Sequence, residues 1–319
     1  MLRQNPARSC VVVAMLVVAA VSLAPGQARA EKVLRWKFKA GEKTRYVMTM
    51  EMTQAMNIAG NAIETKMTQM IDMTWAIDSV DAKGVAAMSQ TIDRMRMDMT
   101  SGMGGVNIKL DSADKKKPEG LSAMIAPLLD GMVGKPVAMK VTARGEISDV
   151  KLPQEMLDAF KKVPGAEQMG ALFSEDGFKQ MTSQGMLTLP EDAVTEGKSW
   201  TSATESKNPI LGKQKMTTDY TYQGTETRDG QELAKIATKL TMSFEPPKDA
   251  PVKVELKDQD NKGLILFDEA KGRISESGSA SKMKMQISAM GMNIDQDMTV
   301  NVKMTLAPPE SKSAEASAK

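Results

Sequence analysis

The side chains that could carry chemistry are restricted in this sequence. The 319 residues contain no histidine and one cysteine, Cys10. Catalytic triads with histidine, cysteine nucleophiles, ordinary zinc sites and haem ligated by His or Cys all need one of these side chains. The remaining options are catalysis by carboxylate pairs or serine–lysine dyads, and metal binding through oxygen or thioether ligands.

One stretch has the spacing of a calcium-binding loop. Asp258, Asp260 and Glu269 occupy positions of oxygen ligands in such a loop. Lys262 stands where a further oxygen ligand is expected, and the flanking sequence has the composition of strands, whereas a calcium hand needs helices. The competing interpretation is a hairpin turn around residues 260–263. The three carboxylates are therefore candidate calcium ligands, and a carboxylate-dependent hydrolase stays open as an alternative function.

Methionine is the anomaly of the composition. The chain has 29 methionines, while aromatic residues make up only 4%. Methionine is apolar and adaptable, so it can fill an irregular core, line a pliable cavity or present thioether ligands to Cu(I). All three interpretations stay open. The candidates for Cu(I) are the groups Met95, Met97, Met99 and Met290, Met292.

The elements that must position these methionines are β-strands. Apolar residues alternate with polar ones at a period of two around residues 46–52, 71–77, 95–99, 106–110, 216–222, 283–287 and 298–304. This alternation is typical of antiparallel strands with one face inward and one face in water. The candidates for lining a ligand cavity on the inward faces are Met48, Met50, Met52, Met73, Trp75, Met95, Met97, Met99, Met283 and Met285.

The centre of the chain has helical periodicity instead. Residues 121–132 carry apolar side chains at helical spacing, and Pro127 is expected to kink or split that helix. A second helix is expected over 153–163 and a third over 166–184, interrupted by Gly177. We therefore predict an α+β fold: a mainly antiparallel, strongly curved, half-barrel-like sheet with two or three central helices on one face.

The N-terminus has the three parts of a signal peptide. Positive residues precede an apolar run of about fourteen residues, which is shorter than a membrane-spanning helix. Small residues at Ala28 and Ala30 then predict cleavage before Glu31, which would remove Cys10. We thus expect residues 1–30 to be a signal peptide and the protein to be exported to the periplasm or the medium, with no stable membrane span after cleavage.

Length and composition bound the rest of the chain. We expect a single β-rich domain over residues 31–306, with a split near 187–200 as the alternative, and a disordered tail over 307–319. The 42 basic and 40 acidic side chains nearly balance. We therefore expect no nucleic-acid partner, and no motif calls for a cofactor.

Four stretches carry a resemblance to known proteins: LRWKFKAGEKTRYVMTMEM, LLDGMVGKPVAMKVTARGEISDV, LPEDAVTEGKSW and GLILFDEAKGRISES. They resemble a class of secreted bacterial proteins of unknown function. The resemblance implies an uncharacterised exported β-rich domain and supplies no catalytic residues. More loosely, a curved antiparallel sheet with helices against one face is similar to bacterial lipoprotein carriers, at the level of the fold only.

Taken together, the sequence favours an exported, non-enzymatic binding or carrier module. Its partner would be an apolar, lipid-like small molecule or another protein, held by reshaping of the methionines. A methionine-based Cu(I)-handling protein and the carboxylate-dependent hydrolase are the alternatives.

Overall fold

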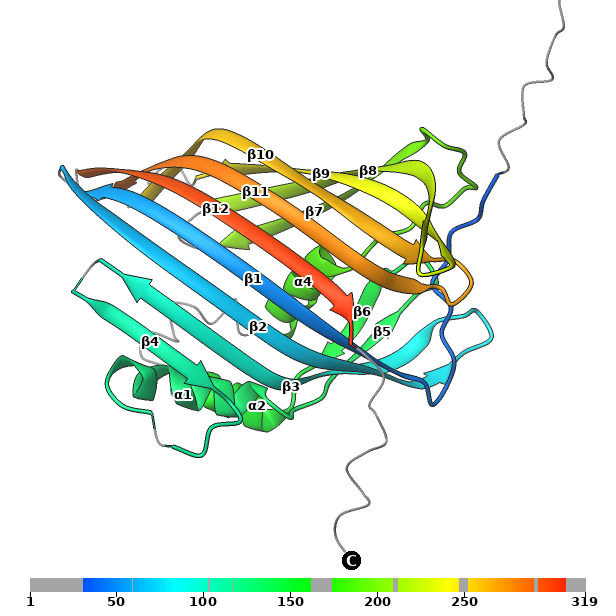
Figure 1. Cartoon of the computed structure of the whole chain (residues 1–319), viewed down its shortest axis with the longest axis horizontal. Coiled ribbons are helices and arrows are strands. Elements are labelled where there is room, and N and C mark those ends of the chain that lie inside the picture. The colour runs from blue at the N-terminus through cyan, green and yellow to red at the C-terminus, as the bar shows by residue number, and fades with distance from the viewer. Residues whose placement is uncertain are drawn as a thin grey trace, which may run out of the picture. The chain divides into compact units, whose positions relative to one another are not determined.

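The computed structural model describes residues 31–58, 60–102, 104–116, 118–161, 174–208, 212–246, 252–289 and 292–307 (Figure 1). The chain from Glu31 onward forms one compact unit. The expected signal peptide and all but the first residue of the expected tail lie outside the described residues.

The described residues contain twelve strands and three helices. The strands are β1 (Lys43–Ile58), β2 (Asn61–Val80), β3 (Ala86–Ser101), β4 (Val106–Asp111), β5 (Val137–Val141), β6 (Ile147–Lys151), β7 (Ser199–Asn208), β8 (Gly212–Arg228), β9 (Gln231–Glu245), β10 (Val252–Asp268), β11 (Arg273–Ala289) and β12 (Met292–Leu306). The helices are α1 (Leu121–Met132), α2 (Gln154–Lys161) and α4 (Glu175–Gly185).

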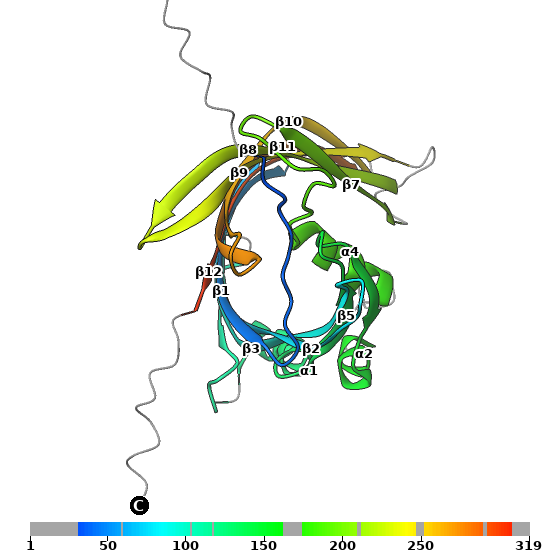
Figure 2. The ribbon, with the colours of Figure 1, turned by 90° about the vertical axis from the view of Figure 1, so that its right-hand side faces the viewer.

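The strands form one curved, open, antiparallel sheet (Figures 1 and 2). Its order is β6-β5-β3-β2-β1-β12-β11-β10-β9-β8-β7, with β4 paired to β3. The first and last long strands are neighbours, since Met48 of β1 lies opposite Met304 of β12. The predicted fold class, a mainly antiparallel curved sheet with helices, is confirmed.

Exposed and half-buried positions alternate along the second half of β1. On β1, the exposed Glu51, Thr53 and Ala55 alternate with the half-buried Met52 and Gln54. A strand with this pattern buries one face whichever neighbours it pairs with. This is why sixteen residues of β1 can stay extended without a break.

The segment before β1 lies on the inner side of the sheet and forms the centre of the main core (Figure 2). Trp36 is buried, and its indole N–H donates to the carbonyl oxygen of Leu187 at 3.0 Å. A Cβ on Gly145, whose φ is +89°, would lie 2.2 Å from that oxygen, so the close approach requires glycine. Strands far apart in the sheet also contribute to this core, with Ile77, Met88, Val141, Tyr220, Ile236 and Phe267.

The two edges of the sheet are joined by a helix. Helix α4 contacts both β6 and β7, which end the strand order. It begins at Ser174, whose side chain accepts a hydrogen bond from the backbone N–H of Gly177. Gly177 thus lies in the first helical turn, and the interruption predicted there is wrong. Phe178 anchors the helix against Phe160 of α2, with ring centroids 6.0 Å apart.

The other two helices agree with the sequence in position. Helix α1 spans the predicted residues 121–132, and Pro127 lies inside it without splitting it. Helix α2 covers Gln154–Lys161, within the predicted range. Helix α1 sends Leu129 onto the inner face of the sheet, against Tyr46 and Met95. The three helices therefore share the inner side of the sheet with the main core.

The hairpin turn predicted at residues 260–263 is wrong, because β10 runs straight through them. Asp260 and Lys262 are exposed on one face and Asn261 is buried on the other. A Cβ on Gly263 would lie 2.5 Å from Thr238 Oγ1 and 2.8 Å from the carbonyl oxygen of Gly278. The glycine therefore allows neighbouring strands to approach closely, and it makes no turn.

Strands β9 and β10 separate after a short pairing. Their backbones pair only over residues 262–267 of β10. Beyond that point, Gln259 Oε1 accepts from the backbone N–H of Met242 at 2.8 Å, and Gln259 Nε2 donates to the Met242 carbonyl at 2.9 Å. Asn261 Nδ2 donates to the carbonyl of Leu240 at 3.1 Å. Side-chain amides thus replace the missing backbone pairing.

Candidate functional site

The inner face of the sheet beyond the core is lined with methionine. We call this surface the methionine face. Its members are half-buried and come from five neighbouring strands: Met48, Met50, Met52, Met56, Met67, Met97, Met99, Met285, Met298 and Met304.

The strand register sets these side chains in cross-strand rows. Met52 lies opposite Met67, and Met67 lies opposite Met99, so three thioethers cross β1, β2 and β3 in one line. Met298 likewise lies opposite Met283 on β11. Directly opposed residues have Cβ atoms about 4.5–5.5 Å apart, so their side chains touch.

Among the described residues, no charged side chain occupies the inward positions of this surface. The inward residues opposite or between the methionines include Ile58, Ile63, Thr65, Gln54, Gln69, Ser101, Ser277, Ser279, Ser281, Ile287, Ile294, Gln296, Val300 and Val302. Gln69 Nε2 donates to the sulfur of Met95 at 3.4 Å, and the hydroxyls of Thr65 and Ser101 are 2.8 Å apart. The polar groups there are neutral, and several bond to their neighbours.

The charges of the same strands are on the outer face. Arg94 binds Asp111 through two hydrogen bonds, and Arg96 binds Asp72 at 2.8 Å. The Arg94 guanidinium, helped by the backbone N–H of Ala113, lowers the pKa of Asp111 to about 2. The outer face is therefore a hydrated surface of paired charges, chemically unlike the methionine face.

The ten residues predicted to line a cavity all lie on the inner side, in two different environments. Met48, Met50, Met52, Met97, Met99, Met285 and Trp75 are half-buried, whereas Met73, Met95 and Met283 are buried. Met73 and Met95 pack against Tyr46, Ile71 and Leu129 and fill the core. Whether any of the ten contacts a ligand stays a prediction.

Four members of the methionine face were missed by sequence reasoning. Met56 and Met67 continue the alternation of β1 and β2 toward the hairpin that joins them. Met298 and Met304 fall in a stretch that was predicted as a strand, but nothing local indicates that β12 lies beside β1. The pattern could have found the first two, while the last two needed the strand order.

A small apolar cavity lies on the described part of the inner side. It measures about 80 Å³ and lies between β3, β5 and the helices, lined among others by Ile92, Met132, Met139, Met156 and Phe178. This volume is well below the roughly 300–1,000 Å³ of pockets that enclose drug-sized ligands. The methionine face itself is a broad curved wall.

The three candidate calcium ligands do not converge. Asp258 and Asp260 lie within β10, on its exposed face, opposite Lys284 and Lys282 of β11. Glu269 follows the far end of that strand and binds Lys32 Nζ at 2.9 Å. Across the described ranges, no group of three or more carboxylate, histidine or cysteine side chains is placed to hold a metal ion. The calcium prediction therefore gains no support.

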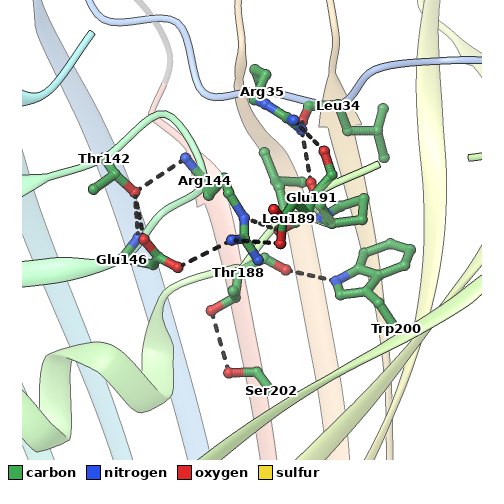
Figure 3. Close-up of polar contacts among 11 residues, drawn as sticks. Leu34, Arg35, Thr142, Arg144, Glu146, Thr188, Leu189, Glu191, Trp200 and Ser202 are labelled. Carbon is green, nitrogen blue, oxygen red and sulfur yellow. Dashed lines mark hydrogen bonds and ion pairs between the residues drawn. The ribbon is translucent and has the colours of Figure 1, made fainter. Parts of the chain in front are cut away.

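A cluster of polar contacts surrounds residues 188–190, in the segment before β7 (Figure 3). Its donors point at backbone carbonyls: Trp200 Nε1 donates to Thr188 at 2.7 Å, Arg35 Nη1 to Pro190 at 2.7 Å and Arg144 Nε to Leu189 at 3.3 Å. These bonds hold an irregular segment against the core. The cluster therefore has a structural role, because it attaches this segment to the core.

Comparison with known proteins places the chain in a family. A family model described as a family of unknown function, DUF6263, matches residues 83–307, more than half of the chain. The chain belongs to this family. The resemblance to uncharacterised proteins is thereby confirmed, and DUF6263 membership brings no assigned activity. A search of curated proteins gave no match.

Solved structures similar to this DUF6263 protein share its fold only remotely. A lipovitellin structure, titled for its lipid–protein interactions, is 14% identical with a TM-score of 0.43 and covers 87% of this chain, which spans 27% of lipovitellin. The hypothetical lipoprotein YmcC from Escherichia coli K12 is 10% identical with a TM-score of 0.24, covering 81% of this chain and 87% of its own. DynF from the dynemicin pathway of Micromonospora chersina is 8% identical with a TM-score of 0.24, and 88% of each chain is covered. Likenesses this low carry no argument about function.

The helices α1, α2 and α4 are short, and none within the described ranges is long and apolar enough to cross a membrane.

Proposed function

We propose that this DUF6263 protein is an exported, non-enzymatic carrier or binding module that holds an apolar, lipid-like ligand against its methionine face. The observation that supports it most is the separation of chemistry across one sheet. The inward positions carry neutral side chains and many half-buried thioethers, while the outward positions of the same strands carry paired charges. An apolar surface of this kind disfavours contact with the charged part of a ligand, because a buried unpaired charge costs several kcal/mol.

Methionine suits an apolar ligand of variable shape. Its unbranched side chain has three rotatable bonds, so a lining of methionines can adapt to different acyl chains. The methionine face spans five strands, and the cavity under the helices measures only about 80 Å³. We therefore expect the ligand to lie along the curved wall rather than inside an enclosed pocket.

The ligand can be tested directly on protein from its own host. Native mass spectrometry after mild extraction is expected to show a co-purifying lipid. Lipid-stripped protein is expected to bind a fluorescent fatty acid with a Kd below about 10 µM. A clean apo mass together with no binding of the probe would contradict the proposal. N-terminal sequencing of the exported protein should begin at Glu31.

A matched pair of variants locates the ligand. Met67→Lys places a charge on the methionine face, and it is expected to weaken binding of the probe at least about tenfold. Thr68→Lys places the same charge one residue further along β2, where the side chain is exposed on the outer face. That variant is expected to bind normally. Equal binding by both variants would show that the ligand does not bind at the methionine face.

A further inference from the structure

Three methionines form the longest unbroken row of thioethers that the strand register gives. Met52, Met67 and Met99 lie directly opposite one another on β1, β2 and β3. All three residues are half-buried on the same face, so none of them is sealed inside the core. No other three adjacent strands of the described sheet bring methionines into one register row.

The spacing of the row permits convergence on one ion. Neighbouring strands are about 4.8 Å apart, so the Cα atoms of Met52 and Met99 are separated by roughly 10 Å, with Met67 between them. A methionine side chain has three rotatable bonds, so the outer two can lean over the central residue. Three sulfurs can thus meet above β2 without movement of the backbone.

The surroundings of the row select the kind of ion. The next row toward the core contains Met50, Gln69 and Met97, and the row on the other side contains the hydrogen-bonded pair Thr65 and Ser101. No carboxylate faces inward there, so a hard cation such as Ca²⁺ or Mg²⁺ would lack ligands. Neutral thioethers are soft ligands that favour Cu(I).

We propose that Met52, Met67 and Met99 form a trithioether site for Cu(I). The proposal does not depend on the apolar ligand. Thioethers carry no proton that a metal must displace, so the affinity for Cu(I) should not change between about pH 5 and pH 8, unlike that of cysteine or histidine sites.

The test uses the chain from Glu31 onward, which is one compact unit and contains neither cysteine nor histidine. Under anaerobic, reducing conditions, Cu(I) is titrated against a chromophoric chelator at pH 5 and pH 8. One ion per chain is expected to bind with a Kd at or below about 1 µM. X-ray absorption of the complex is expected to show sulfur scatterers around copper. Binding weaker than this, or a first shell without sulfur, would overturn the site.

Two triple variants decide whether the row itself binds. Met52→Leu/Met67→Leu/Met99→Leu keeps the volume and apolar character of the row, and it is expected to weaken Cu(I) binding by about 100-fold or more. The control Met285→Leu/Met298→Leu/Met304→Leu removes three thioethers of the same face that do not share a row. An equal loss in both variants would mean that no single site exists.

Further measurements keep the outcome clear. If the row triple variant fails to fold by circular dichroism, the single Met67→Leu variant replaces it, because Met67 adjoins both partners. The Cu(I) titration of the unmodified protein is carried out without the fluorescent fatty acid. Binding of Cu(I) by a protein that binds no fatty acid would support this site and contradict only the carrier proposal.

Discussion

At the scale of single residues, two neighbouring indole N–H groups differ in whether they have a hydrogen-bond partner. The indole N–H of Trp36 donates to the carbonyl of Leu187, whereas that of Trp75 is buried without a partner among the described residues. The two rings are neighbours, with centroids 6.1 Å apart. Substitution of Trp36 would therefore remove a hydrogen bond, whereas substitution of Trp75 would remove none that the described residues show.

This contrast gives a prediction at the residue scale. Trp36→Phe leaves the buried oxygen of Leu187 unpaired, so it should lower the free energy of unfolding by about 1–3 kcal/mol more than Trp75→Phe. Both substitutions replace an indole by a phenyl ring, so each is the control for the other. Urea unfolding followed by circular dichroism measures the difference. Equal losses would show that the hydrogen bond contributes nothing.

The alternation along each strand predicted which methionines point inward, because the side-chain period of a strand does not depend on its partner strand. It did not separate Met73 and Met95, which fill the core, from Met97 and Met99, which stay half-buried. That separation depends on Leu129 of α1, which covers one part of the inner face. The sequence of β3 contains no information about which helix lies above it.

At the scale of elements, the separation of β9 and β10 depends on two amide side chains. Gln259 bonds both the N–H and the carbonyl of Met242, at the point where the strand backbones no longer pair. Without this amide, two backbone groups of β9 lose their partners. The outer strands β7, β8 and β9 are joined to the rest of the sheet through this short ladder.

Gln259→Leu should therefore lower the free energy of unfolding by about 1–3 kcal/mol. It should also speed amide hydrogen exchange in β8 and β9 while leaving β1 and β2 unchanged. Gln286→Leu is the control, because Gln286 bonds only the exposed Asp295 on the outer face. Uniform faster exchange throughout the sheet would contradict a local role for Gln259.

Elements were predicted well where periodicity was long and poorly where one glycine or proline was decisive. The strands and α1 agree with their patterns, but Gly263 and Gly177 were both read as breaks. Gly263 serves the close approach of β9 and β11, and Gly177 donates its N–H to the helix cap. The contact at Gly263 is tertiary, so local sequence does not reveal it. The cap at Gly177 comes from Ser174, three residues earlier, which is a local signal that the periodicity did not include.

At the scale of the whole described unit, the inner segment before β1 joins parts of the sheet that share no strand pairing. The backbone N–H of Trp36 donates to Ala143, next to β5, and that of Lys37 donates to Gly272, between β10 and β11. Leu34, in the same segment, is fully buried. The segment therefore links the part of the sheet around β5 with the part around β10 and β11.

Leu34→Ala should lower the free energy of unfolding by about 2–5 kcal/mol, because it leaves a cavity in the core beside the segment that links these two parts of the sheet. Val33 is 62% exposed, so Val33→Ala is the matched control and should change stability by less than about 0.5 kcal/mol. Thermal and urea unfolding of both variants provide the measurement. Similar stabilities of the two variants would show that the segment is only loosely attached.

The fold class could be predicted from the sequence, but the strand order could not. Alternation indicated an antiparallel sheet, and hairpin turns indicated which consecutive strands pair. The pairing of β1 with β12 joins residues such as Tyr46 and Leu306, and no local pattern encodes so distant a contact. The methionine face depends on that pairing, since Met298 and Met304 join it only through β12.

The position of β12 also has a consequence for how the chain is made. Among the described strands it is the last in the chain, yet it lies in the middle of the sheet, between β1 and β11. Until β12 pairs, β1 and β11 each present a long unpaired edge that another chain can bind. We therefore expect aggregation to start from chains in which β12 has not yet paired.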